Sequence, residues 1–293
     1  ALNARVKVQE RLEKSRIKAP FVEIKEPYIN LSAYNVMDEA TVLKVTDYNV
    51  AFDDILLKNV NFEIKSTDKV AIVGPNGTGK TTLLGEILKN NNDCIELNEN
   101  VEIAYLSQLQ SKTLNNSNTI LEEFFDVGFK TREDILSHIS CYGFEEERIN
   151  QKIGTLSGGE KNLLQLAKIS ESKSNMLLLD EPTCHLDTYS QIALEKAIQN
   201  YKGAIIMISH DFYTIVNCMD YVLIIEDKTI RKVKMKKFKR MIYANHFGRD
   251  YLEIEQSKKI VETKIQLALK YNDFIVAKEL SEELEGLIKL LQI

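Results

Sequence analysis

The chain has 293 residues, with 38 Lys or Arg against 43 Asp or Glu, so its formal net charge is −5. It is 44% apolar and 28% charged, which excludes disordered and fibrous classes and indicates a globular protein. The mild acidity argues against a general nucleic-acid binder. At one domain per ~150 residues we expect about two domains, or one large α/β domain with an appendage. The apolar runs are much shorter than the ~18 residues of a membrane-spanning helix, so we expect no membrane insertion.

The four cysteines, Cys94, Cys141, Cys184 and Cys218, form no CxxC pair and lie at no zinc-finger spacing from a histidine. So few cysteines in a long chain predict free thiols in a reducing compartment, which favours the cytoplasm. The sequence begins at Ala1 without Met and shows no charged and apolar leader. We expect it to be a piece of a longer chain, or a processed chain.

The first twenty residues form a basic stretch that ends at Pro20. Six basic side chains stand there against two acidic ones, with few large apolar residues between them. This pattern predicts an exposed helix that ends before the proline. Two interpretations stay open, a solvated surface helix and the end of a linker that touches something anionic.

Short apolar runs that predict strands recur from about Thr41 onward. They cover residues 42–45, 55–64, 70–73, 176–179, 204–208 and 222–225. Helical periodicity lies between them, for example at Leu83, Leu84, Ile87 and Leu88. Strands that alternate with helices predict parallel strands with helical cover, so we expect an α/β fold.

A glycine-rich loop follows the strand at 70–73 and fits the pattern GxxxxGK[ST] at every fixed position. Its glycines allow backbone N–H groups to turn inward around phosphate oxygens, and the helix that follows adds its positive dipole end. Lys80 is expected to reach the β- and γ-phosphates of a nucleotide, and the Thr81 hydroxyl to ligate Mg²⁺. The expected phosphate-binding residues are Gly74, Pro75, Asn76, Gly77, Thr78, Gly79, Lys80, Thr81 and Thr82.

Two further motifs carry charge or anion-binding groups. The buried-type strand at 176–179 runs into Asp180 and Glu181, at the end where open α/β sheets place ligand groups. Asp180 is expected to hold Mg²⁺, and Glu181 to orient and deprotonate an attacking water. The segment Leu156-Ser157-Gly158-Gly159-Glu160 precedes a helix-like run, and its serine and glycine N–H groups predict a second anion cradle. Alone, an apolar run that ends in two acidic residues is mostly structural.

In this order, the motifs resemble those of the ATP-binding cassette ATPases over about residues 41–230. The resemblance adds a Gln loop at 105–108, a D-loop at 185–187 and a switch histidine, His210. It implies a phosphate-loop α/β cassette with a mixed sheet and a helical subdomain. ATP would lie between two cassettes that face each other head to tail. Since the chain holds one phosphate loop and one signature, it would supply one half of each of two composite sites.

The resemblance also implies a role for each matched residue. Glu181, His210 and Gln108 would be catalytic, and Thr81, Gln108 and Asp180 would hold Mg²⁺. The signature residues Ser157, Gly158, Gly159 and Glu160 would close the nucleotide site of the partner cassette, and Asp187 would reach across the interface. Phe52 would stack on adenine, with Tyr48 as the reserve candidate.

Within that family the chain resembles the ABC-F subfamily. The signature continues with Lys161, the D-loop reads His-Leu-Asp, and a basic helix precedes the cassette. Cys184 and Phe212 depart from the Asn and Arg that the subfamily motifs carry at these places. The implied function is ATP-dependent binding to the ribosome, with rRNA, tRNA and ribosomal proteins as partners, in translation or in antibiotic resistance. A transporter subunit and an ATP-gated scaffold without turnover stay open as alternatives. The short interval between Gln108 and Leu156 argues against genome-maintenance ATPases.

The C-terminal part is predicted to be basic and then helical. Residues 231–240 hold seven basic side chains in ten, which indicates either an rRNA contact or a solvated charge run. Apolar residues at helical spacing, with a turn near 271–273, predict a helical hairpin. The expected domains are a linker end at 1–35, a cassette at 41–242 and a C-terminal extension at 245–293. We expect no role for Gln110, and His138 is expected at the surface.

Overall fold

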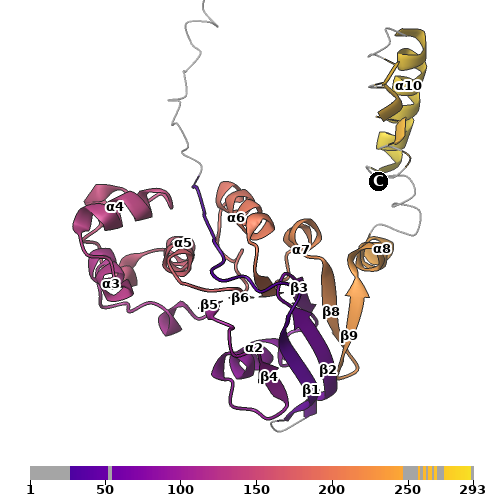
Figure 1. Cartoon of the computed structure of the whole chain (residues 1–293). Coiled ribbons are helices and arrows are strands. Elements are labelled where there is room, and N and C mark those ends of the chain that lie inside the picture. The colour runs from indigo at the N-terminus through magenta and orange to yellow at the C-terminus, as the bar shows by residue number, and fades with distance from the viewer. Residues whose placement is uncertain are drawn as a thin grey trace, which may run out of the picture.

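The computed structural model describes residues 27–51 and 55–246 and, in the C-terminal part, 257, 260–261, 263–265, 267–268 and 274–291 (Figure 1). The described elements are, in chain order, β1 (Thr41–Ala51), β2 (Ile55–Lys65), β3 (Lys69–Val73), α2 (Lys80–Lys89), β4 (Ile95–Leu97), β5 (Ile103–Leu106), η1 (Gln110–Lys112), α3 (Ile120–Val127), α4 (Arg132–Ser140), η2 (Glu146–Arg148), η3 (Ile153–Thr155), α5 (Gly158–Ser170), β6 (Met176–Asp180), α6 (Thr188–Asn200), β7 (Ala204–Ile208), α7 (Phe212–Cys218), β8 (Tyr221–Glu226), β9 (Thr229–Lys234), α8 (Met235–His246) and α10 (Phe274–Leu291). Each strand that the sequence predicts is confirmed.

Two sheets organise the cassette. The larger has the strand order β5-β6-β7-β3-β8-β9, in which the first five strands run parallel and β9 runs antiparallel at the edge. The smaller is antiparallel, with the order β2-β1-β4. Its apolar face and helix α2 join one face of the larger sheet in a single hydrophobic core. The expected mixed sheet is therefore present, and its parallel strands place their carboxyl ends at one edge.

The central strands β6 and β7 of the larger sheet are buried along their whole length, because residues 176–179 and 204–208 are all apolar. In β6, Met176 and Leu178 pack toward the smaller sheet and α2. Leu177 and Leu179 point to the other face, into a core that α5 and α6 complete. Successive side chains of a strand point to opposite faces, so a continuous apolar run is what a central strand between two layers requires. The two layers hold the strand ends, and the loops that follow them, in fixed positions.

Helices α3, α4 and α5 form a helical lobe to one side of the sheets (Figure 1). A capping box at Thr119 begins α3, and a second one at Ser157 begins α5. Against the expectation, His138 is not at the surface. Its side chain is only 15% exposed, its Nε2 hydrogen-bonds the carbonyl oxygen of Ala167 at 2.9 Å, and its ring packs against Phe124 and Tyr142. Packing across the lobe, which no local pattern predicts, covers most of this side chain.

The two ends of the chain are described in part. The basic helix expected within 1–20 lies outside the described residues. The basic run 231–240 forms β9 and the start of α8, where Val233 and Phe238 are buried. Helix α10 is present, and Figure 1 draws it beyond α8, apart from the sheets. The turn expected at 271–273 lies outside the described residues, so the helical hairpin stays a prediction.

Candidate active site

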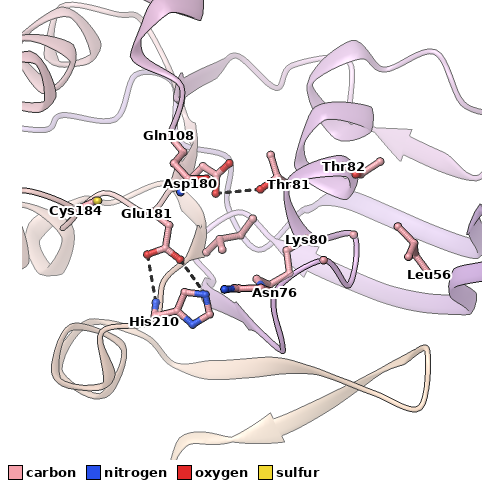
Figure 2. A pocket seen from close by; sticks show the side chains of 13 residues that line it. Leu56, Asn76, Lys80, Thr81, Thr82, Gln108, Asp180, Glu181, Cys184 and His210 are labelled. Atoms are coloured by element: carbon pink, nitrogen blue, oxygen red, sulfur yellow. Dashed lines mark hydrogen bonds and ion pairs between the residues drawn. The ribbon is translucent and has the colours of Figure 1, made fainter. Parts of the chain in front are cut away.

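The expected catalytic residues follow four neighbouring strands. Gln108 follows β5, Asp180 and Glu181 stand at the end of β6, His210 follows β7, and the phosphate loop follows β3. Because these strands are parallel and adjacent, their carboxyl ends bring the four segments to one edge of the sheet. Together they line a cavity of about 600 Å³ (Figure 2). Strand order therefore assembles one site from residues between positions 56 and 210 of the chain.

The phosphate loop presents a positive surface to this cavity. Gly79 is the N-cap of α2 at φ 90°, a backbone conformation that favours glycine, and no side chain caps the helix. The first N–H groups of α2 are thus available to an anion. Lys80, only 7% exposed, donates hydrogen bonds of 2.8 Å to the backbone oxygens of Gly74 and Pro75. Burial lowers the pKa of Lys80, against the opposing influence of Glu181 and Asp180.

A buried lysine at the positive end of a helix is electrostatically unfavourable by itself. An anion bound in the loop would remove both parts of that cost, since it pairs with the ammonium group and with the helix dipole. These features fit a phosphate group better than a neutral ligand.

Three oxygen-bearing side chains at the cavity fit a magnesium ion. Thr81 Oγ1 donates to Asp180 Oδ1 at 3.4 Å, and Gln108 lines the same cavity. Hydroxyl, carboxylate and amide oxygens are hard ligands, and Mg²⁺ is commonly held by one or two carboxylates together with substrate phosphates. Within the described residues no group of three or more His, Cys, Asp or Glu gathers, so phosphate oxygens would have to complete such a site.

Glu181 and His210 lie against each other in the cavity that the phosphate loop also lines. The backbone N–H of His210 donates to Glu181 Oε2 at 3.3 Å, and His210 Nε2 lies 3.5 Å from Glu181 Oε1 (Figure 2). Burial raises the pKa of Glu181, and the nearby charge and N–H group of His210 oppose this rise. A carboxylate with a raised pKa is a stronger base, so this group is suited to take a proton from water.

Two aromatic residues, Phe52 and Tyr48, are the candidates for stacking on adenine. Phe52 lies outside the described residues, so its stacking on adenine stays a prediction. Tyr48, the reserve candidate, is 2% exposed in the core shared by the two sheets, and burial raises its pKa to about 12. Tyr48 is therefore a core residue, and the prediction that it could stack on adenine is wrong. Leu56 at the start of β2 lines the cavity instead, an apolar contact that the motifs do not reveal.

The signature residues lie outside the 600 Å³ cavity. Ser157 is exposed and caps α5, where its side chain accepts from Glu160 N. Arg148 holds Glu160 at 2.5 Å and, with the hydrogen bonds of the cap, lowers the pKa of that carboxyl to about 2. A Cβ on Gly159 would lie 2.4 Å from the backbone oxygen of His185, so the D-loop requires glycine there. Ser157 and the two glycines therefore do not contribute to the cavity that Lys80 lines.

Asp187 forms hydrogen bonds within its own chain. It caps α6, accepting hydrogen bonds from the backbone N–H groups of Tyr189 and Ser190 and from the Ser190 hydroxyl at 2.8 Å. The backbone N–H of Ser190 is the largest influence that lowers the pKa of Asp187. A contact of Asp187 across an interface between cassettes stays a prediction.

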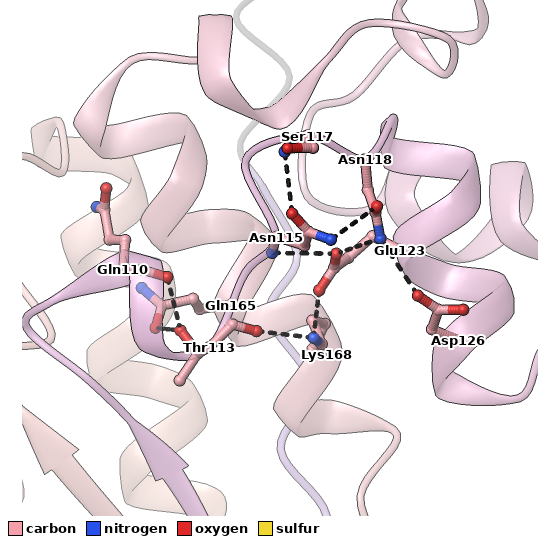
Figure 3. Close-up of polar contacts among 9 residues, drawn as sticks. All are labelled: Gln110, Thr113, Asn115, Ser117, Asn118, Glu123, Asp126, Gln165 and Lys168. Atoms are coloured by element: carbon pink, nitrogen blue, oxygen red, sulfur yellow. Dashed lines mark hydrogen bonds and ion pairs between the residues drawn. The ribbon is translucent and has the colours of Figure 1, made fainter.

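A polar network fastens the Gln loop to the helical lobe (Figure 3). Gln110, for which the motifs predict no role, donates from Nε2 to the backbone oxygen of Gly158 at 2.8 Å. Thr113 bonds Gln165 of α5, and Lys168 of α5 donates both to Thr113 O at 2.8 Å and to the buried Glu123 at 2.5 Å. The loop that carries Gln108 is therefore fixed to the helix that carries the signature.

Comparison with known proteins identifies the family. Residues 57–184 match the sequence profile of the ABC transporter family. The chain is 34% identical over 237 residues to ABC transporter F family member 2 of Arabidopsis thaliana, which covers 78% of this chain and 34% of that protein. The chain belongs to the ATP-binding cassette family. The cassette is also 32% identical over 229 residues to Ribosome protection protein VmlR of Bacillus subtilis, over 76% of this chain and 42% of that protein.

These relatives confirm the resemblance to the ABC-F subfamily. The chain spans about a third of the length of the first curated relatives that it matches. Its structure resembles a dimeric ATP-binding cassette solved in a post-hydrolysis state with ADP and Pi, with a TM-score of 0.53 and 23% identity over 66% of this chain and 98% of that one. That likeness confirms the cassette fold. In the described part of the chain, no helix has the length and apolar character needed to cross a bilayer.

Proposed function

We propose that this chain is the ATP-binding and ATP-hydrolysing cassette of an ABC-F protein that binds the ribosome in its ATP-closed form and leaves it on hydrolysis. The observation that carries the proposal is the similarity to ABC-F proteins, one of which is a ribosome protection protein. The partners would be rRNA, tRNA and ribosomal proteins, and the place of action the cytoplasm. The whole protein would act either as a translation factor or in protection of the ribosome against antibiotics.

The chemistry follows from the positions of the side chains. Lys80 and the first N–H groups of α2 would bind the β- and γ-phosphates of ATP. Glu181 would take a proton from the attacking water, while His210 orients the Glu181 carboxylate and contacts the γ-phosphate. Thr81, Asp180 and Gln108 would hold Mg²⁺, which neutralises charge on the phosphate oxygens. The products are ADP and inorganic phosphate.

A second cassette completes the site in this proposal. Ser157 and Gly159 do not line the chain's own nucleotide cavity, which supports a role in closing the nucleotide site of a partner. The amides and the hydroxyl of the partner would be attracted to the γ-phosphate, so its loss on hydrolysis would loosen the pair. The partner is either a second cassette of the same protein or a second copy of this chain.

The proposed domains follow the same division. Residues 41–242 would be the cassette, 1–35 the end of the interdomain linker, and 245–293 a C-terminal extension. Strand β9 and helix α8 carry the basic run 231–240, whose Lys and Arg side chains would contact rRNA phosphates. Contacts of this kind weaken as salt rises and carry little sequence information.

Sedimentation with ribosomes tests the proposal. The Glu181→Gln variant of the protein, in its two-cassette form, should bind ATP, stay closed and sediment with ribosomes in ATP but not in ADP. Glu195→Gln, the same chemical change on α6 away from the cavity, should sediment no more than the unmodified protein. Absence of the Glu181→Gln protein from the ribosome pellet, with recovery in membranes through a partner subunit, would instead support a transporter subunit.

Turnover separates a hydrolase from a scaffold that only binds ATP. We expect phosphate release by the two-cassette protein and its loss in Glu181→Gln, because an amide cannot accept the proton of the water. Equal phosphate release by the two proteins would refute the assignment of Glu181 as the base. Translation assays with and without ribosome-targeting antibiotics would then distinguish protection from a general role.

A further inference from the structure

Asn162 is a buried polar residue on the signature helix. It lies in the second turn of α5, five positions after Ser157, and is 3% exposed. Its Nδ2 donates two hydrogen bonds, of 2.8 Å to the backbone oxygen of Pro182 and of 3.0 Å to that of Cys184. The two acceptors lie one and three positions after Glu181, so the side chain joins the signature helix to the turn that carries the proposed base.

An asparagine at this buried position lowers the stability of the fold unless its hydrogen bonds compensate for the burial of its polar atoms. Its neighbours on the buried side of α5, Leu164 and Leu166, are fully buried in the apolar core. The described residues offer Asn162 Oδ1 no hydrogen-bond donor. A buried polar atom without a partner costs roughly 1–3 kcal/mol, a cost that an apolar side chain of the same size would not carry. The two donated bonds are thus the specific gain that an asparagine brings here.

The backbone that Asn162 holds is in an uncommon conformation. Glu181 has φ 52° and His185 has φ 63°, both in the left-handed region that non-glycine residues rarely adopt. Cys184 N donates to Glu181 O at 3.1 Å and closes the turn between them. Such a conformation persists only where the surroundings determine it. The bonds from Asn162 to Pro182 O and Cys184 O are contacts that can do so.

Asn162 and Glu181 also share a wall of one cavity. A second cavity of about 330 Å³ lies beside the nucleotide cavity, and its lining includes Gln108, Gln110, Asn162 and Glu181. The Gln loop, the signature helix and the catalytic turn therefore meet at this cavity. A displacement of α5 would therefore be transmitted to Glu181 by Asn162, without the nucleotide taking part.

We propose that Asn162 is a positioning residue for Glu181, and that it ties the partner-facing start of α5 to the chain's own catalytic turn. Contact of Ser157 with the partner's nucleotide would then fix the direction of Glu181 toward the nucleotide bound by Lys80. The inference rests on the proposed function, because it takes Glu181 as the base. It assigns to α5 a second task besides closing the partner's site.

The test compares Asn162→Leu with the unmodified two-cassette protein. We expect kcat to fall at least tenfold, while nucleotide affinity and KM change less than twofold. ATP-closed assemblies should accumulate on ribosomes, as for Glu181→Gln, because closure is intact and hydrolysis is slow. Asn162→Asp, which keeps the size but turns an oxygen toward the two backbone oxygens, should lose kcat in the same way and serves if Asn162→Leu does not fold.

Asn175 offers a matched control at the opposite end of β6. It is also a 3% exposed asparagine, and its Nδ2 donates to the backbone oxygens of Asn100 and Asn35 at 2.8 and 3.3 Å. Asn175→Leu should lower the unfolding temperature as Asn162→Leu does, but leave kcat within twofold. Equal kcat for the two leucine variants, or a parallel loss of nucleotide affinity in Asn162→Leu, would overturn the inference. If Glu181→Gln itself retains full turnover, the assignment of Glu181 as the base in the proposed function is what is refuted.

Discussion

The side chain of Gln110 donates a hydrogen bond of 2.8 Å to the backbone oxygen of Gly158, and so joins the Gln loop to the first residue of the signature helix. Gln108, two positions earlier, lines the cavity proposed for the nucleotide. A displacement of Gln108 by a γ-phosphate would therefore reach Gly158 through a single side chain. This contact offers a direct physical path from ATP binding in one site to closure of the other.

Gln110→Leu removes this hydrogen bond and is expected to weaken the coupling between the Gln loop and the signature helix. Loss of one hydrogen bond of about 1 kcal/mol corresponds to roughly a fivefold decrease in ATP-dependent pairing of cassettes. Nucleotide affinity of the chain 1–293 should stay unchanged, because Gln110 is absent from the lining of the nucleotide cavity. Light scattering in ATP measures the pairing, and fluorescent nucleotide titration measures the affinity. Gln199→Leu, which removes a similar bond to Asn217 O on the surface, is the control and should pair normally.

The sequence predicts those parts of the fold that depend on short stretches of chain. The all-apolar run at 176–179 predicts a central strand, and the spacing from Gly74 to Thr81 predicts the phosphate loop. The burial of Asn162 and the contact of Gln110 depend on which segment packs across from them. Polar residues within a helical pattern look solvent-facing until that partner is known, so both positions escaped prediction.

Tyr48 shows a different case, in which the neighbouring residues indicate burial. It stands in β1 (Thr41–Ala51), two positions before the buried Val50, with the exposed Asn49 between them. This alternation predicts a buried side chain rather than a stacking residue, although a register shift separates Tyr48 from Val45. The aromatic ring alone favours Tyr48 as an adenine contact.

Lys80→Ala should lower nucleotide affinity. Hydrogen bonds to a charged group contribute about 1.5–3 kcal/mol, so the dissociation constant for ATP should rise roughly 10- to 150-fold. Lys89→Ala, at the other end of α2, removes an exposed lysine paired with Glu86 at 3.0 Å and should leave affinity unchanged. Calorimetric titration of each variant with ATP makes the comparison. Equal affinity of the Lys80→Ala and Lys89→Ala variants would contradict the phosphate-binding role.

The raised pKa of Glu181 predicts an acid limb in the pH profile of kcat. Burial disfavours the charged carboxylate, so protonation sets in at a higher pH than for an ordinary glutamate. Since only the carboxylate accepts a proton, kcat should fall as the pH decreases through that pKa. The titratable neighbours Asp180, Lys80 and His210 line the same cavity, so the profile belongs to the group as a whole. An acid limb below the range of exposed glutamates would contradict this assignment.

The ion pair of Arg148 and Glu160 should make stability depend on pH. The pKa of Glu160 falls from 4.5 to about 2 in the folded chain, chiefly because Arg148 bonds its carboxylate. The pair therefore stabilises the fold above pH 4.5, and that contribution is lost as the pH falls toward 2. Both side chains are about one third exposed, so solvent screening limits the contribution to about 1 kcal/mol.

Arg148→Gln tests this by denaturant unfolding at several pH values. The variant should be less stable than the unmodified chain at neutral pH, and the difference should shrink in acid. Arg132→Gln removes the more exposed pair with Glu146 and should change stability little. A difference for Arg148→Gln that stays constant from pH 7 down to acid would show that the pair is not the cause.

Ser157→Ala should separate nucleotide binding from pairing. Ser157 caps α5 but lies outside the nucleotide cavity of its own chain, so the chain 1–293 should bind ATP with unchanged affinity. The hydroxyl is expected to contact the partner's γ-phosphate, so ATP-dependent pairing should be lost. Removing the cap also costs about 1 kcal/mol of stability. Thr119→Ala removes the equivalent capping box from α3 and should lose a similar amount of stability while pairing normally. If Ser157→Ala loses ATP affinity in the isolated chain, or if both variants pair alike, the composite site is refuted.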